Sequence, residues 1–320
     1  MPCFDMPLEE LKTYTGSSPR PADFDEYWRR GMAEMESVYA PPELVRSDFP
    51  AKYSDCYDMY FTGVGGARIH CRIHLPKNIT KPVPCVCFYH GYAGNAGDWW
   101  WHSYWAAQGY AYASIDCRGQ SGTSKDVGGV KGTTLFGHII RGLEDPNPDK
   151  LLYRSIYLDC VQMARCMMNM DCVDETQVYT TGVSQGGALS LVTAALEPKI
   201  AKVVTASPFL SDYKRAWEMD ILPDGYPEIK DYFRHRDPTH ETEKEVFDKL
   251  GYIDIQNHAP NVRAKVLMIT SLMDDDCPVS TQFAMYNKLT CEKEVLIYPD
   301  FRHELFPGMS DAMFRFLVDK

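Results

Sequence analysis

Residues 177–189 read Gln-Val-Tyr-Thr-Thr-Gly-Val-Ser-Gln-Gly-Gly-Ala-Leu. The first seven residues are typical of a buried strand, and the apolar run that begins near residue 187 is typical of a helix. Between them, residues 182–186 match Gly-x-Ser-x-Gly, where a serine occupies a sharp turn and glycines let neighbouring backbone approach closely. About one chain in ten of this length would contain the pattern by chance. The alternative is a glycine-rich loop without chemistry, and the strand-turn-helix context favours a nucleophilic Ser184.

The segments on either side of this turn indicate the fold. After residue 82, short apolar runs alternate with helical stretches such as 151–170 and 188–196. Runs that are apolar on both faces suit a parallel sheet covered by helices on each side. The sequence therefore predicts an α/β-hydrolase fold with a doubly wound, mostly parallel sheet. The predicted strands are residues 85–89, 110–115, 178–183, 203–206, 266–269 and 295–298.

The rest of the chain is expected to belong to the same single domain, residues 1–320. Residues 1–50 are predicted to form an N-terminal helical extension, because apolar residues recur at helical spacing within 23–38. Two strand-like runs, 57–61 and 69–75, are separated by glycines and predict a hairpin. Residues 214–261 are polar and interrupt the strand–helix alternation, so we interpret them as an insertion before the strand that carries the catalytic acid. We expect this insertion to lie near the site and at a subunit interface.

A serine hydroxyl needs a base and an orienting acid to become a nucleophile. In this fold the chain order is serine, acid, histidine. His303 follows the last predicted strand and is the predicted base. The preceding strand leads into Asp274, Asp275 and Asp276, and spacing alone does not choose among these three carboxylates.

Stabilisation of the tetrahedral oxyanion requires two backbone N–H donors. One is predicted at Gln185, directly after the nucleophile, and the other at Tyr92, in the glycine-rich loop after the strand 85–89. The turn that contains Arg118 follows another predicted strand, at the sheet edge where α/β sites assemble, so Arg118 is predicted to support the site. Residues 99–101 are three tryptophans, with Trp105 nearby. They could stack on sugars, but packing of a helix on the sheet is favoured.

Composition excludes several classes of partner. The chain has 33 basic and 44 acidic side chains, a net charge of −11, and no basic run, which argues against nucleic acid as a partner. Its eleven cysteines include no Cys-x-x-Cys pair, so no metal site is predicted. No apolar run reaches the roughly 18 residues of a membrane span. The first residues do not resemble a secretory leader, and a reducing, cytoplasmic compartment is expected.

Three motifs together resemble the signatures of one family, the acetyl xylan esterases and cephalosporin C deacetylases of carbohydrate esterase family 7. The resemblance extends over nearly the whole chain, because residues 4–11, 23–28, 207–210 and 272–274 also match. Three motifs in this order are far more specific than one serine turn. The motifs are Arg118-Gly119-Gln120, Gly182-Val183-Ser184-Gln185-Gly186-Gly187 and His303-Glu304.

The resemblance implies Asp274 as the acid of the triad and supports Tyr92 and Gln185 as oxyanion donors. It implies removal of acetyl groups from short xylo-oligosaccharides and cephalosporin C, without a metal or other cofactor. It also implies a bacterial, intracellular homohexamer whose active sites face an internal cavity. Arg118, Gly119, Gln120 and Glu304 are then supporting residues. We expect Arg118 and Glu304 to form an ion pair across the site.

Three functions other than an acetyl esterase are alternatives for this sequence. A broad-specificity short-chain carboxylesterase acting on other substrates would use the same residues. A peptidase of the prolyl-oligopeptidase type would need a large gating domain, for which this chain has no room. A catalytically silent binding protein on the same fold is the third alternative. The presence of every catalytic residue type argues against it.

Overall fold

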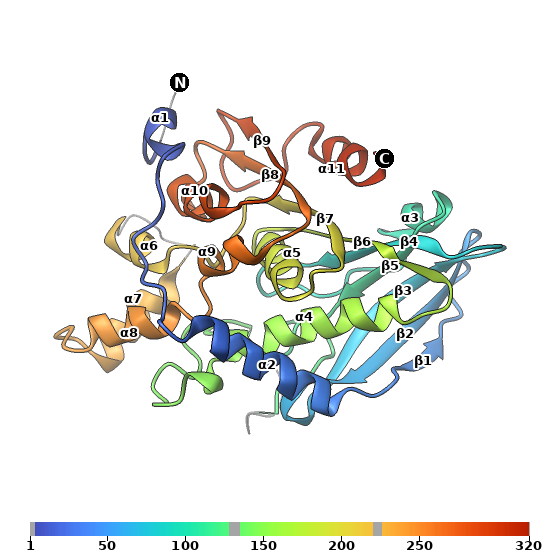
Figure 1. The fold of residues 1–320 in the computed structure, drawn as a ribbon, viewed down its shortest axis with the longest axis horizontal. Coiled ribbons are helices and arrows are strands. Elements are labelled where there is room, and N and C mark those ends of the chain that lie inside the picture. The colour runs from blue at the N-terminus through green and yellow to red at the C-terminus, as the bar shows by residue number, and fades with distance from the viewer. Residues whose placement is uncertain (1–3, 128–134, 220–225, 320) are drawn as a thin grey trace.

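A computed structural model of the chain describes residues 4–127, 135–219 and 226–319. Within these ranges one nine-stranded sheet runs through the molecule, in the order β1-β2-β3-β5-β4-β6-β7-β8-β9 (Figure 1). The first three pairs in this order, β1–β2, β2–β3 and β3–β5, are antiparallel, and every later pair, from β5–β4 to β8–β9, is parallel. The strands are β1 (Glu43–Arg46), β2 (Ser54–Thr62), β3 (Arg68–Pro76), β4 (Val83–Tyr89), β5 (Ala111–Ile115), β6 (Val173–Val183), β7 (Ile200–Ala206), β8 (Lys265–Ser271) and β9 (Lys293–Tyr298).

Helices cover both faces of this sheet, which confirms the predicted doubly wound α/β-hydrolase architecture (Figure 1). The sheet divides the apolar core into two clusters, one beneath each layer of helices. The larger core cluster includes residues of α2, α4, α5 and α10, and the smaller one includes residues of α3 and α11 on the opposite face. The helices are α1 (Leu8–Leu11), α2 (Phe24–Val38), α3 (Ser103–Ala107), α4 (Leu152–Met168), α5 (Gln185–Leu196), α6 (Tyr213–Met219), α7 (Pro227–Arg236), α8 (Glu243–Leu250), α9 (Ile255–His258), α10 (Val279–Lys288) and α11 (Met309–Val318), with short 3₁₀ turns η1 (Val64–Gly66), η2 (Pro148–Lys150) and η3 (Ala259–Asn261).

The N-terminal segment packs along the body of the domain rather than standing apart from it. Helix α2 buries the apolar face predicted from its spacing, including Phe24 and Trp28. The Trp28 indole N–H donates to the carbonyl of Tyr252 at 3.0 Å, so α2 contacts the segment between α8 and α9. The sequence did not predict β1, whose four residues are all exposed at the edge of the sheet.

Between β7 and β8 the chain forms α6, α7, α8 and α9, so the polar stretch interpreted as an insertion contains helices of its own. The cysteines of the described residues are all free, and all but Cys172 and Cys291 are buried. In the described part of the chain, no helix is long and apolar enough to cross a bilayer.

Candidate active site

Ser184 lies between the end of β6 and the start of α5, in a left-handed conformation with φ of 60° and ψ of −123°. This backbone is strained for a residue with a side chain, and such strain is typical of a nucleophile elbow. The tight approach of β4 explains the glycines on either side. A Cβ on Gly186 would lie 1.9 Å from the Tyr89 carbonyl oxygen, and a Cβ on Gly182 would lie 2.5 Å from that same atom.

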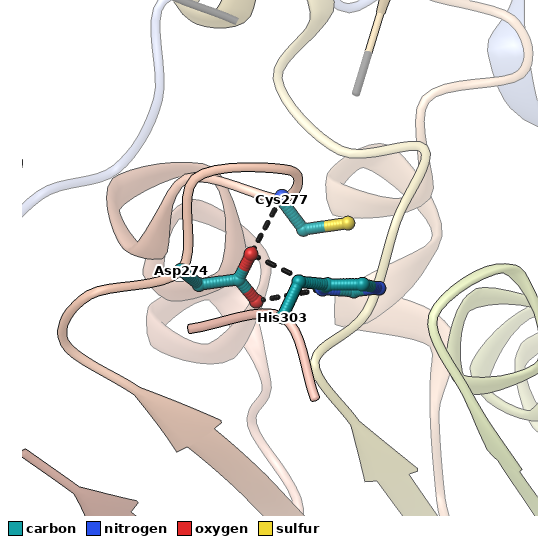
Figure 2. A group of neighbouring side chains, drawn as sticks. All are labelled: Asp274, Cys277 and His303. Carbon is teal, nitrogen blue, oxygen red and sulfur yellow. Dashed lines mark hydrogen bonds and ion pairs between the residues drawn. The ribbon is translucent and has the colours of Figure 1, made fainter. Parts of the chain in front are cut away.

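The predicted acid and base are hydrogen-bonded to one another. His303 Nδ1 lies 3.0 Å from Oδ2 and 3.1 Å from Oδ1 of Asp274, whose side chain is fully buried (Figure 2). A carboxylate only accepts, so Nδ1 carries a proton and Nε2 is left to accept one. Ser184 and His303 follow parallel strands of one sheet and therefore lie at its carboxyl edge. No hydrogen bond between their side chains is recorded among the described residues.

The structure distinguishes the three consecutive carboxylates. The Asp274 carboxylate also accepts from the peptide N–H of Cys277 at 2.8 Å and from Gln282 Nε2 at 3.1 Å, which fixes its orientation. Asp275 instead forms an ion pair with Arg302. Asp276 donates its peptide N–H to Asp274 at 3.1 Å. Of the three, Asp274 is the one placed to hold the His303 imidazole.

The thiol of Cys277 lies beside this pair (Figure 2). Burial raises the pKa of Cys277 to about 11, so the thiol is protonated at neutral pH. Burial lowers the pKa of His303, but the effects of Cys277 and Asp274 are larger in sum and raise it. Since the thiol is neutral, the negative charge next to the imidazole at neutral pH is that of Asp274. One donor atom from each of these three residues lies within 4.8 Å of the others, and no metal is needed to explain the hydrogen bonds they make.

The loop after β4 carries Tyr92 and approaches the elbow from the other side. His90 fixes its start, since Nδ1 donates to the Gly91 carbonyl at 2.7 Å and Nε2 accepts from the peptide N–H of Cys117 at 3.1 Å. Ala93, the residue after Tyr92, has a left-handed φ of 57°. A non-glycine residue keeps such a backbone only where its surroundings hold it.

The Gln185 side chain connects the elbow to three other segments: the loop after β5, helix α4 and the loop after β4. Its Oε1 accepts from Gln120 Nε2 at 2.7 Å and from the Tyr153 hydroxyl at 2.8 Å. Its Nε2 donates to Gln120 Oε1 at 3.1 Å and to the His90 carbonyl at 3.3 Å. Gln120 therefore supports the elbow directly, through a reciprocal pair of amide hydrogen bonds.

The expected ion pair between Arg118 and Glu304 is wrong. Arg118 is 2% exposed, and its Nε and Nη2 each donate to Asp159 of α4 at 2.7 Å. Glu304 is exposed, and its carboxylate accepts from the peptide N–H of Arg302 at 3.1 Å. A buried guanidinium needs a buried carboxylate, and Asp159 supplies it. Gly119 follows with a φ of 76°, which lets the chain turn from Arg118 to Gln120.

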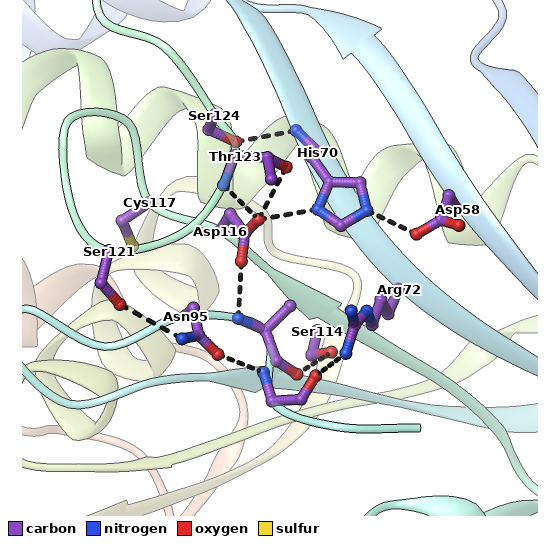
Figure 3. Close-up of polar contacts among 12 residues, drawn as sticks. Asp58, His70, Arg72, Asn95, Ser114, Asp116, Cys117, Ser121, Thr123 and Ser124 are labelled. Carbon is purple, nitrogen blue, oxygen red and sulfur yellow. Dashed lines mark hydrogen bonds and ion pairs between the residues drawn. The ribbon is translucent and has the colours of Figure 1, made fainter. Parts of the chain in front are cut away.

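A second buried network, missed by the sequence analysis, holds the neighbouring loops together (Figure 3). The Asp116 carboxylate accepts from His70 Nδ1 at 2.7 Å, the peptide N–H of Ala96 at 2.6 Å and that of Thr123 at 2.8 Å. His70 Nε2 lies 2.7 Å from Asp58 Oδ1. Because carboxylates only accept, both nitrogens of His70 carry protons and the ring is an imidazolium.

The charges of this network perturb its pKa values. Burial lowers the pKa of His70, but the hydrogen bonds to Asp116 and Asp58 outweigh burial and raise it. Burial raises the pKa of Asp116, and the hydrogen bonds from His70, Thr123 and Ala96 outweigh that effect and lower it. The network therefore ties β3, the loop after β4 and the loop after β5 to one buried carboxylate, Asp116.

The sequence predicts that the tryptophans near residue 100 pack a helix on the sheet rather than stack on sugars, and the structure differs from one tryptophan to another. Trp105 is buried and contacts Phe314 of α11, with ring centroids 5.3 Å apart, as packing predicts. Trp100 and Trp101 are 75% and 69% exposed. For these two residues the packing interpretation is wrong.

The fold places the chain in the α/β-hydrolase class. The α/β-hydrolase fold is shared with enzymes of low sequence identity, among them the acylaminoacyl peptidase of Pyrococcus horikoshii. That chain is 16% identical, with a TM-score of 0.59 over 79% of this chain and 38% of the other. Such a likeness shows the fold alone.

The family follows from closer matches. The acetyl xylan esterase (AXE1) family model matches residues 1–320, so the chain belongs to the acetyl xylan esterase family and is a carboxylic ester hydrolase. Acetyl xylan esterase 1 from Thermoanaerobacterium sp. JW/SL YS485 is 51% identical, with a TM-score of 0.95 over 99% of both chains. The acetyl xylan esterase from Paenibacillus sp. R4 is 34% identical, with a TM-score of 0.89 over 98% of this chain and 99% of that one.

A longer relative is also similar. Acetyl esterase Axe7A of Xylanibacter ruminicola is 28% identical over 303 residues, which cover 92% of this chain. The chain spans 65% of the length of that relative.

Proposed function

We propose that this chain is a serine esterase that removes acetyl groups from small acetylated sugars, notably xylo-oligosaccharides. The observation that carries the proposal is the buried Asp274–His303 hydrogen bond at the same sheet edge as the strained Ser184 elbow. A serine, a base with a free Nε2 and an acid that fixes its tautomer are the parts of a nucleophilic triad. Membership of the acetyl xylan esterase family supports the acetyl ester as substrate.

In the first half of the proposed reaction, Ser184 Oγ attacks the acetyl carbonyl carbon while His303 Nε2 takes its proton. The carbonyl oxygen becomes an oxyanion and accepts hydrogen bonds from the peptide N–H groups of Tyr92 and Gln185. Collapse of this intermediate breaks the bond to the sugar oxygen. The sugar leaves as an alcohol with the proton from His303, and the acetyl group remains on Ser184.

In the second half, a water molecule attacks the acetyl-enzyme and His303 takes a proton from it. Collapse of the second oxyanion releases acetate and returns the proton to Ser184 Oγ. Asp274 stabilises the imidazolium at both stages and remains ionised throughout. The proposed steps are general acid–base and covalent catalysis by side chains, with no cofactor.

The substrate range is tested by measuring acetate release from acetylated xylo-oligosaccharides, cephalosporin C and longer-chain nitrophenyl esters in parallel. We expect the acetylated xylo-oligosaccharides to be cleaved most efficiently and cephalosporin C to be cleaved as well. Faster cleavage of butyrate and longer esters than of any acetylated sugar would instead favour a broad-specificity carboxylesterase. No turnover of any ester by the folded protein would favour a binding protein.

We further propose that the protein acts in the cytoplasm as a homohexamer with its sites facing an internal cavity. This proposal rests on the resemblance of the three motifs. Light scattering after size-exclusion chromatography should give about six times the monomer mass of 36.5 kDa. Acetate release should also fall as xylan chains lengthen, because an enclosed site excludes polymers. A monomer that deacetylates polymeric xylan as fast as xylobiose would contradict the proposal.

A further inference from the structure

A buried carboxylate from the insertion reaches into the loops at the carboxyl edge of the sheet. Glu228 lies in the first turn of α7 and is 6% exposed. Its Oε1 accepts from the Tyr92 hydroxyl and from the peptide N–H of Gly137 at 2.7 Å, and its Oε2 accepts from the peptide N–H of Ile139 at 2.8 Å. One side chain thus joins α7, the loop after β4 and the segment before α4.

The Tyr92 side chain is held on several sides. Its hydroxyl donates to Glu228 and accepts from the peptide N–H of His138 at 3.1 Å. Its ring lies 5.8 Å from that of Phe209, centroid to centroid. The peptide N–H of Phe209 donates to the Ser184 carbonyl at 3.2 Å. Phe209 therefore connects the Tyr92 ring to the nucleophile.

The loop that carries Tyr92 is closed by a turn, in which the peptide N–H of Gly94 donates to the Gly91 carbonyl at 3.0 Å, and the Asn95 side chain donates to Ser121 Oγ at 3.2 Å. Its start is fixed by His90, and its end is fixed where the peptide N–H of Ala96 donates to Asp116 at 2.6 Å. Between these points lie Tyr92 and the left-handed Ala93. Oxyanion donors act only when they are aimed beforehand. The direction of the Tyr92 peptide N–H therefore depends on this turn and on the contacts that hold the Tyr92 side chain.

We infer that Glu228 is a positioning residue for the oxyanion hole: it fixes the Tyr92 side chain and thereby aims the Tyr92 peptide N–H at the ester oxygen. The inference rests on the proposed function, in which Tyr92 is an oxyanion donor. It gives the insertion between β7 and β8 a role in the chemistry, since its helix α7 supplies the carboxylate. Glu228 itself does not touch the substrate.

The test compares Glu228→Gln with a matched control, Asp237→Asn. Asp237 is also a buried carboxylate of the insertion, and it accepts from the peptide N–H groups of Glu241 and Thr242 and from the Thr242 hydroxyl. Both variants replace one acceptor oxygen by an NH₂ group. Only Glu228 contacts Tyr92.

Loss of a whole oxyanion donor lowers kcat by about 10²–10³-fold. Since Gln185 remains, we expect kcat of Glu228→Gln to fall by about 10- to 100-fold, with KM for an acetyl ester changed by less than about threefold. Asp237→Asn should keep kcat within about twofold of wild type. Equal losses of kcat in the two variants would mean a general structural effect and would overturn the inference.

A second variant and a binding measurement keep the test independent of folding. Tyr92→Phe leaves both peptide N–H bonds to Glu228 and removes the two hydrogen bonds of the phenol, the one it donates to Glu228 and the one it accepts from the peptide N–H of His138. It should lower kcat by roughly 3- to 10-fold. Boronic acids form a tetrahedral adduct with a nucleophilic serine and mimic the oxyanion. Their inhibition constant should rise by the same factor as kcat/KM falls, in both variants. Unchanged kcat and boronate affinity in folded Tyr92→Phe and Glu228→Gln would overturn the inference.

The outcome also separates this inference from the proposed function. A folded wild-type enzyme that neither releases acetate nor binds a boronic acid would contradict the proposed function itself. An active wild-type enzyme with fully active Tyr92→Phe and Glu228→Gln variants would contradict only the role of Glu228.

Discussion

Asp159→Asn is the substitution whose consequence follows most directly from the geometry. Both oxygens of Asp159 accept from the Arg118 guanidinium at 2.7 Å, and both side chains are buried. Arg118 also donates to the Val64 carbonyl at 3.2 Å. Because a guanidinium does not lose its proton, the neutral asparagine leaves a buried cation without a counter-charge.

Breaking a buried ion pair by neutralising one partner costs about 3–5 kcal/mol of unfolding free energy. Unfolding entropy near 60 °C is about 2.1 cal/mol/K per residue, or about 0.7 kcal/mol/K for 320 residues. The melting temperature of Asp159→Asn should therefore fall by about 4–7 °C. Urea unfolding at constant pH measures the free energy, and calorimetry measures the melting temperature.

Two control variants test whether the loss comes from the unpaired charge. Glu304→Gln should leave the melting temperature within about 1 °C of wild type, because Glu304 is exposed and does not contact Arg118. The double variant Arg118→Met with Asp159→Leu removes both charges and should recover most of the loss. An unchanged melting temperature in Asp159→Asn, or a larger loss in Glu304→Gln, would refute the reasoning.

Four further predictions concern the site. Ser184→Ala should lose nearly all esterase activity, keeping at most the roughly 10³–10⁴-fold advantage over water that binding and the oxyanion hole supply; wild-type turnover in acetate-release assays would contradict it. Asp274→Asn should lower kcat by about 10⁴-fold, whereas Asp275→Asn should have a far smaller effect, because Asp275 pairs with Arg302 instead; kinetics of both variants in parallel decide this. In a pH–rate profile kcat/KM should fall as pH drops, since protonated His303 cannot accept the serine proton. The midpoint of this fall should lie above about pH 6.5, because the pKa of His303 is raised. A flat profile down to pH 4 would mean that another group is the base. Gly186→Ala would place a Cβ 1.9 Å from the Tyr89 carbonyl oxygen and should cost about 3 kcal/mol or more of unfolding free energy; wild-type stability in urea would show that β4 can move.

Much of the fold could be predicted because its signals are local. Buried parallel strands read as short apolar runs. Five of the six predicted runs lie within a strand of the sheet, and the sixth, 110–115, begins one residue before β5. Ser184 could be found because a serine elbow needs glycines at fixed offsets. His303 could be found because this fold fixes the order of its catalytic residues along the chain. The exposed strand β1 gave no such signal, since none of its residues is buried.

The partners of the predicted residues could not be read from spacing. Arg118 and Glu304 both lie in recognisable motifs, yet Arg118 turns away from the edge toward α4. Asp159 did carry a signal, because it is the one acidic residue of the apolar helix α4 and is buried there. His70 and Glu228 carried none. Their neighbours Asp116 and Tyr92 come from distant parts of the chain, and only the folded structure brings them together.

Four buried carboxylates organise the carboxyl edge of the sheet: Asp116, Asp159, Glu228 and Asp274. Asp116, Glu228 and Asp274 each accept hydrogen bonds from more than one segment, including peptide N–H groups of loops, and both oxygens of Asp159 accept from Arg118. Loops lack the backbone pairing of strands and helices, so their buried N–H groups need acceptors from elsewhere. A carboxylate with two oxygens satisfies several donors at once and holds them in a fixed geometry. Part of the acidic excess of this sequence is therefore internal scaffolding for the site rather than a surface property, and Asp274, the proposed catalytic acid, is one member of that scaffold.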